Sequence, residues 1–127
     1  MPSPIQVPAF PLQWPNHVPR TPVHRRESSK FGKVNWDHEL KYLAPELKLL
    51  GANYVTISTN MELRRDGKPY AQQRLMEDAG VAVYFTVNGD QVCFPCDRWK
   101  TLGENLRAIV KHIGAMRGPS RWGVGPA

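Results

Sequence analysis

The clearest alternation of apolar and polar residues along the chain predicts a β-hairpin. Apolar side chains occupy every second position from 81 to 87. The Asn88-Gly89 pair that follows is the favoured dipeptide of a type I′ turn, which needs positive φ at both central residues. Residues 91–94 return as a second strand. This segment therefore predicts an antiparallel hairpin.

Two other segments have apolar residues three and four positions apart, the spacing of an amphipathic helix. In the first, from residue 34, Asn35 or Asp37 is the candidate N-cap and Gly51 the C-terminal stop. Pro45 lies inside this pattern and predicts a kink or the start of a second short helix. The apolar stripe consists of Leu40, Leu43, Leu47 and Leu50.

The second helix is predicted from about residue 102 to 117. Thr101 and Glu104 have the spacing of a capping box, and Gly118-Pro119 ends the segment. One apolar stripe runs through Leu102, Leu106, Ile109, Val110, Ile113 and Met116.

The order of these elements predicts an α+β fold. Residues 53–59 alternate and are rich in β-branched side chains, which indicates a strand. The polar segment 61–79 predicts a long loop in which Asp66-Gly67 is a candidate hairpin turn. We expect a two-layer sandwich, in which both helices cover one face of a small antiparallel or mixed sheet of three or four strands.

The chain divides into an arm, one domain and a tail. Residues 1–33 form the arm, which is rich in proline at its start and basic from residue 20 onward. Proline excludes helix and central strand, so the arm is expected to be extended, with Phe10 and Trp14 as anchors on the domain and a flexible basic part. Residues 34–118 form the single α+β domain, and residues 119–127 a flexible tail.

Composition narrows the class of protein. The chain has 127 residues, 41% hydrophobic and 22% charged, which fits one globular domain and excludes full disorder. No apolar run reaches the roughly 18–20 residues of a membrane span. The start of the chain lacks the charged and apolar regions of a signal peptide. We therefore expect a cytoplasmic protein without a membrane partner.

Charge adds a functional expectation, because 17 Lys and Arg face only 11 Asp and Glu. The basic residues lie in the arm, the polar loop and the second helix, with aromatic residues such as Tyr70 between them. This pattern favours binding of DNA or RNA phosphates, with bases stacked on aromatic rings. A solvated positive surface, or an acidic protein partner, would account for the same charge. The candidate nucleic-acid contacts are Arg25, Arg26, Arg64, Arg65, Arg98, Trp99, Arg107 and Lys111.

Cys93 and Cys96 form a C-x-x-C motif, which we interpret as structural. Cys93 lies within the predicted strand and the helix begins only near residue 101, so the placement differs from that of a thioredoxin-like thiol. A zinc site needs two more ligands at suitable spacing. A metal site and a redox role remain the alternatives, and no cofactor or metal is expected.

The few carboxylates allow a second chemistry. Asp78 before the hairpin and Asp97 after it are expected near one end of the sheet, with Glu104 one turn inside the helix. Such carboxylates are what a metal-dependent nuclease requires. Residues 97–99 and 104–106 faintly resemble small phage Holliday-junction resolvases, although the close acidic pair and following lysine of that pattern are absent. Asp97 fits a turn or cap equally well.

Most of the chain resembles the N-terminal domain of uncharacterised bacterial and prophage J-domain proteins. The segments that carry the resemblance are Trp14-Pro15, Pro19-Arg20-Thr21, Ser58-Thr59-Asn60, residues 80–85, Cys96-Asp97-Arg98-Trp99, residues 104–109 and residues 121–125. In those proteins a J domain follows, but this chain contains no His-Pro-Asp tripeptide. Chaperone recruitment is therefore not carried over. The resemblance implies a mobile-element protein that handles nucleic acid or a protein cargo.

Together these observations predict a non-enzymatic, nucleic-acid-binding accessory protein of a phage or mobile element. One alternative is an interaction module that docks on an acidic protein partner. A second is a small metal-dependent nuclease built on Asp78, Asp97 and Glu104.

Overall fold

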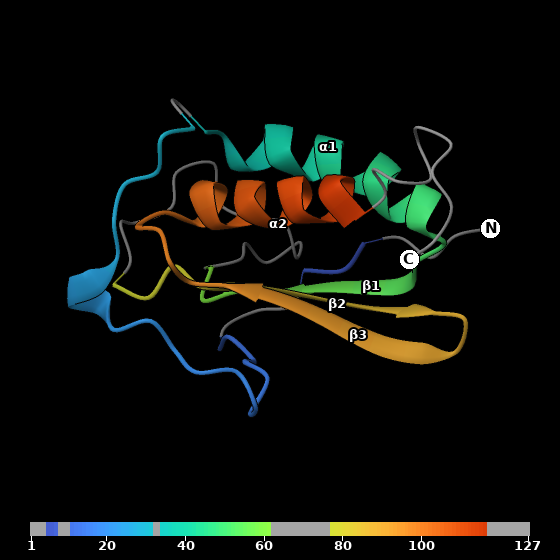
Figure 1. Cartoon of the computed structure of the whole chain (residues 1–127), viewed down its shortest axis with the longest axis horizontal. Helices are drawn as coiled ribbons and strands as arrows, with labels where there is room; N and C mark the ends of the chain where they lie inside the picture. Colours follow the sequence, from blue (N-terminus) through green and yellow to red (C-terminus); the bar gives the residue numbers. More distant parts are fainter. Residues whose placement is uncertain (1–4, 8–10, 32–33, 62–76, 117–127) are drawn as a thin grey trace.

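The computed structural model describes residues 5–7, 11–31, 34–61 and 77–116. In chain order the elements are η1 (Val23–Arg25), α1 (Trp36–Leu50), β1 (Asn53–Ser58), β2 (Val81–Val87), β3 (Asp90–Cys96) and α2 (Leu102–Met116). The sheet has the order β1-β2-β3 and is antiparallel throughout. Both helices lie on one face of it, which confirms the predicted α+β sandwich (Figure 1).

The core lies between this sheet face and the two helices. Alternate residues of the central strand β2, including Val83 and Phe85, are almost fully buried. Leu43 of α1 and Leu106 of α2 are equally buried on the opposite side. The predicted apolar stripes of both helices therefore pack onto the sheet in one core, except at Met116, which is 49% exposed and lies outside it.

The hairpin forms as predicted. Asn88 and Gly89 have φ values of 52° and 83°, the left-handed conformation that a type I′ turn requires. Val87 pairs with Asp90, and the register continues without a bulge to Val81 and Cys96. Pro95 falls in β3, an edge strand, which is where a residue without an N–H group is tolerated in a sheet.

Helix α1 begins and ends at two of the predicted residues. The side chain of Asn35 accepts hydrogen bonds from the N–H groups of Asp37 and His38, at 2.9 and 3.3 Å. Gly51 has a φ of 83° in the left-handed region. Pro45 lies within one continuous helix, so the alternative of a second short helix starting there is wrong.

The Thr101 cap of α2 is confirmed, but the Glu104 carboxylate bonds the Thr101 hydroxyl and not the Thr101 N–H that a full capping box would use. The Glu104 N–H donates to Thr101 Oγ1 at 3.2 Å, and the Thr101 hydroxyl donates to the Glu104 carboxylate at 2.9 Å. The same carboxylate accepts the backbone N–H of Ser29 in the arm. The helix cap is therefore also an attachment point of the arm.

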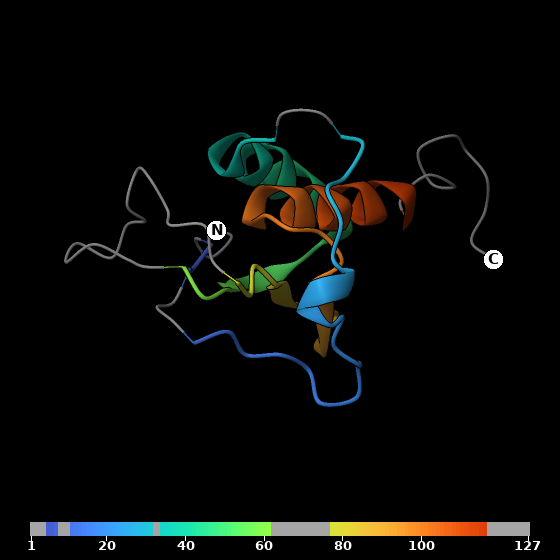
Figure 2. The ribbon, with the colours of Figure 1, turned by 90° about the vertical axis from the view of Figure 1, so that its left-hand side faces the viewer.

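The described part of the arm lies along the domain instead of projecting from it. The N–H of Gln6 donates to the Val55 carbonyl at 3.0 Å, and its carbonyl accepts from Ile57 at 2.8 Å, which adds a parallel bridge to β1. Further on, the arm passes one end of the sheet and the start of α2 before it reaches α1 (Figure 2). Between β3 and α2, the backbone of Glu27 bonds to the backbone of Arg98 and Lys100. Residues 27–31 therefore lie against the domain.

Several predictions fall on residues that the structure does not describe. These are the candidate turn at Asp66-Gly67, the anchor Phe10 and the tail 119–127. Within the described ranges, none of the helices has the length and apolar character needed to cross a membrane.

Two glycines provide a matched test of the backbone. Gly51→Ala should lower the free energy of unfolding by about 1 kcal/mol, because an L-residue is disfavoured in the left-handed region and no atom lies near enough to clash. Gly114→Ala in α2 should raise it by a similar amount, roughly 1 kcal/mol, because a Cβ there would lie 3.9 Å from its nearest neighbour. Urea unfolding followed by circular dichroism measures both. Equal shifts of the same sign would contradict these helix boundaries.

Candidate functional site

An ionic cluster closes one end of the sheet, and we call it the arm clasp. It consists of Arg20, Thr21 and Arg26 from the arm, with Asp78 before β2 and Asp97 after β3. Arg20 bonds Asp97 through Nε at 2.8 Å and Asp78 through a terminal nitrogen at 2.6 Å. Arg26 lies 2.9 Å from Asp78 and 3.6 Å from Asp97. The Thr21 N–H donates to Asp97 at 2.9 Å, so the clasp ties the arm to both strands.

Burial makes this clasp a structural necessity. The side chains of Arg26 and Asp97 are only 4% and 5% exposed, and a buried charge is tolerated only when it is paired and hydrogen-bonded. Two guanidinium groups balance two carboxylates. Burial alone would raise the pKa of Asp78, but hydrogen bonds from Arg20 and Arg26 outweigh it and hold that pKa below its usual range.

Two amide side chains, those of Asn60 and Asn105, continue the clasp into the domain. Asn60 accepts from the Leu12 N–H at 2.9 Å and donates to Asp78. Asn105, which is 0% exposed, donates to the carbonyls of Ala79 and Trp99 and accepts the N–H of Trp99 at 3.0 Å. The loop between β3 and α2 is fixed by these bonds.

Of the three carboxylates in the nuclease hypothesis, the structure brings two together, Asp78 and Asp97. Asp78 and Asp97 share Arg20 and Arg26, as expected for the same end of the sheet. Glu104 points elsewhere, to Ser29 and Thr101. In the described parts of the chain, no group of three or more His, Cys, Asp or Glu residues is placed to hold a metal ion. The two aspartates neutralise arginines, and this arrangement gives the nuclease alternative no support.

A second cluster lies around the loop between β3 and α2, and we call it the cation–aromatic patch. It consists of Phe31, Arg98, Trp99, Lys100 and Lys111. The rings of Phe31 and Trp99 meet edge to face, with centroids 5.9 Å apart. The Arg98 guanidinium lies 5.0 Å from the Trp99 ring, and Lys111 Nζ lies 5.4 Å from the Phe31 ring. Both distances are within cation–π range.

The structure sorts the predicted nucleic-acid contacts into five groups. Arg98, Trp99 and Lys111 are brought together in the patch. Arg107, one turn before Lys111, is partly engaged, with Glu39 at 3.4 Å and the Tyr42 ring at 5.7 Å.

Arg25 lies exposed on η1, whereas Arg26 is buried in the arm clasp and has no surface to offer a phosphate. Arg26 is therefore removed from the set. Arg64, Arg65 and Tyr70 lie outside the described residues. Sequence reasoning missed Phe31, because nothing in the local pattern indicates that an arm residue reaches Trp99.

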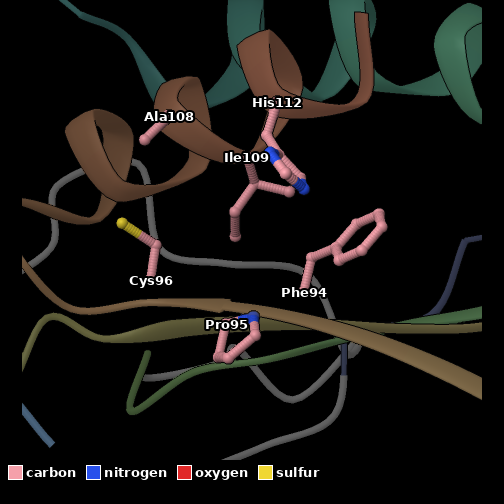
Figure 3. A pocket seen from close by; sticks show the side chains of 6 residues that line it. All are labelled: Phe94, Pro95, Cys96, Ala108, Ile109 and His112. Atoms are coloured by element: carbon pink, nitrogen blue, oxygen red, sulfur yellow. The ribbon is translucent and has the colours of Figure 1, made fainter. Parts of the chain in front are cut away.

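A groove of about 270 Å³ lies between β3 and α2 (Figure 3). Its walls are Phe94, Pro95 and Cys96 on the strand and Ala108, Ile109 and His112 on the helix. The rings of Phe94 and His112 meet edge to face, with centroids 4.9 Å apart. The sequence offers no signal for this groove, since its two walls come from separate elements.

The two cysteines lie on opposite faces of β3. Successive side chains of a strand alternate, so positions three apart point in opposite directions. Cys96 packs against the core and its thiol donates to Asn105 Oδ1 at 3.3 Å. Burial raises the pKa of both thiols. This placement favours the structural interpretation over a shared metal ion or a disulfide.

Comparisons of this chain with protein-family models, with curated proteins and with solved structures gave no match.

The clasp and the α2 cap predict loss of stability in acid. The pKa values of Asp78 and Glu104 are both below the usual range, the latter because bonds from Ser29 and Thr101 outweigh burial. Their contribution is fully present above the unfolded-state pKa of about 4 and is lost as pH falls through the lower folded-state values. Urea unfolding measured from pH 7 to strongly acidic pH should show this loss of stability. In Asp78→Asn, the difference in stability between neutral and acidic pH should be smaller.

The control is Asn105→Ala, which removes bonds from the same region without a titrating group. It should lower the free energy of unfolding by about 1–3 kcal/mol at every pH. A parent protein equally stable at acidic and neutral pH would contradict the pKa directions of Asp78 and Glu104.

The cysteine placement predicts slow thiol chemistry. Iodoacetamide at mildly alkaline pH should alkylate the folded protein more slowly than the urea-unfolded protein, because raised thiol pKa values reduce the thiolate fraction. A mild oxidant should produce no disulfide between Cys93 and Cys96 in the folded state. Mass spectrometry of the digested protein checks both results, and rapid formation of that disulfide would contradict the strand assignment.

Proposed function

We propose that this protein binds nucleic acid without catalysing a reaction, through the cation–aromatic patch on α2 and the loop before it. One observation carries the proposal. Between residues 97 and 111 the carboxylates are buried and three of the cations are exposed, while the exposed Glu27 of the arm lies beside the patch, where its backbone bonds Arg98 and Lys100. Asp97 and Glu104 are only 5% and 9% exposed, whereas Arg98, Lys100 and Lys111 are exposed.

This segregation leaves a positive surface on a rigid support. The buried carboxylates are already satisfied by Arg20, Thr101 and the arm backbone. Phosphate groups that meet the exposed cations release condensed counterions, which is the main source of affinity in sequence-independent binding. The charge therefore favours a polyanion over a small neutral ligand.

The aromatic rings of the patch favour nucleic acid among polyanions. Phe31 and Trp99 are half-buried and lie directly beside the cations. Aromatic rings between cations are typical of surfaces on which bases of single strands stack. An acidic protein partner would meet the same cations and is the alternative that the test must separate. A phage or mobile-element role depends on the family resemblance alone.

Fluorescence anisotropy with labelled single- and double-stranded DNA and RNA tests the proposal. Binding should weaken steeply as salt rises. Lys111→Ala should weaken binding several-fold, because one phosphate contact is lost. The slope of log affinity against log salt concentration should then become smaller by about 1.

The matched control is Lys48→Ala, which removes the same charge from an exposed position on α1. It should leave the affinity nearly unchanged. Absence of binding to every nucleic acid at low salt would overturn the proposal, and capture of an acidic protein after nuclease treatment would then favour the alternative.

A further inference from the structure

We propose that the groove between β3 and α2 holds one unstacked base of a single strand whose phosphates lie on the cation–aromatic patch. This inference rests on the proposed function and adds to it the class of nucleic acid and the site for its base.

The groove has the size and lining of a ring-binding site. Its volume of about 270 Å³ equals the space of roughly nine water molecules, which is room for a planar ring. Ile109, nearly buried, lies between the two ends of the groove, with Cys96 and Ala108 at one end and Phe94 and His112 at the other (Figure 3). The aromatic end offers ring faces for stacking.

The charge beside the groove complements a nucleotide. Lys111 is three residues after Ala108, so the two are neighbours on the surface of α2 and Lys111 lies beside the Ala108 end of the groove. On the strand side, Arg98 follows Cys96 by two residues. None of the six lining residues is acidic. An apolar slot with cations beside it fits a ligand that combines an apolar ring with an anionic backbone.

The outer edge of β3, with which no strand of the described residues pairs, favours a base over a peptide strand. In the hairpin, Val87 and Asp90 form the pair that closes the turn, so alternation places Pro95 at a position whose backbone faces away from β2. Pro95 presents a carbonyl there but no N–H. An added peptide strand needs both donor and acceptor at that position, whereas the amino group of a base needs only the acceptor.

The test compares three ligands of equal length by fluorescence anisotropy: a single strand with bases, an abasic single strand and a duplex. The protein should bind the strand with bases about tenfold more tightly than the abasic strand, the range expected for stacking one base. Ala108→Trp, which fills the groove, should abolish that difference while leaving abasic binding unchanged. Lys111→Ala should weaken both single strands by a similar factor.

A second variant guards against misfolding of the filled groove. His112 is exposed, so His112→Ala should fold normally and should reduce the preference for bases several-fold. Equal affinity for the strand with bases and the abasic strand, or an unchanged preference in both groove variants, would overturn this inference and leave the proposed function standing. Failure to bind any of the three ligands would overturn both.

Discussion

The buried charges of the arm clasp are the constraint on which the rest of this structure depends. Asp97 and Arg26 are almost completely removed from water, so neither can lose its partners without a large cost in free energy. Their partners come from the arm and from the ends of two strands. The requirement to pair these charges therefore decides where the arm runs, and with it the position of Phe31 beside Trp99.

The loop between β3 and α2 connects this constraint to the surface. Asp97 points into the clasp, while its neighbour Arg98 lies on the outside over Trp99. From inside the domain, the Asn105 side chain accepts the backbone N–H of Trp99 and donates to the Trp99 carbonyl. A surface that binds a polyanion benefits from such support, because cations held in place lose less side-chain entropy on binding.

Elements whose partners are close in sequence could be predicted, and long-range side-chain contacts could not. The Asn88-Gly89 turn and the Thr101–Glu104 cap act within a few residues, so their local patterns were sufficient. The union of Asp78 and Asp97 followed from topology. The pairing of Arg26 with these aspartates could not be predicted, because a basic residue in a proline-rich arm has the same local pattern whether it is buried or exposed. The groove was missed for a related reason, since its walls meet only through packing.

The clasp also has a consequence for the order in which the chain folds. Arg20 and Thr21 are separated from Asp97 by 77 and 76 residues, whereas the hairpin pairs residues that are close neighbours in the chain. Closing so long a loop costs conformational entropy before any contact compensates for it, so local elements form first. We expect the hairpin and α2 to assemble early and the arm to dock last. The charges of the clasp then leave water only after the apolar core that surrounds them is complete.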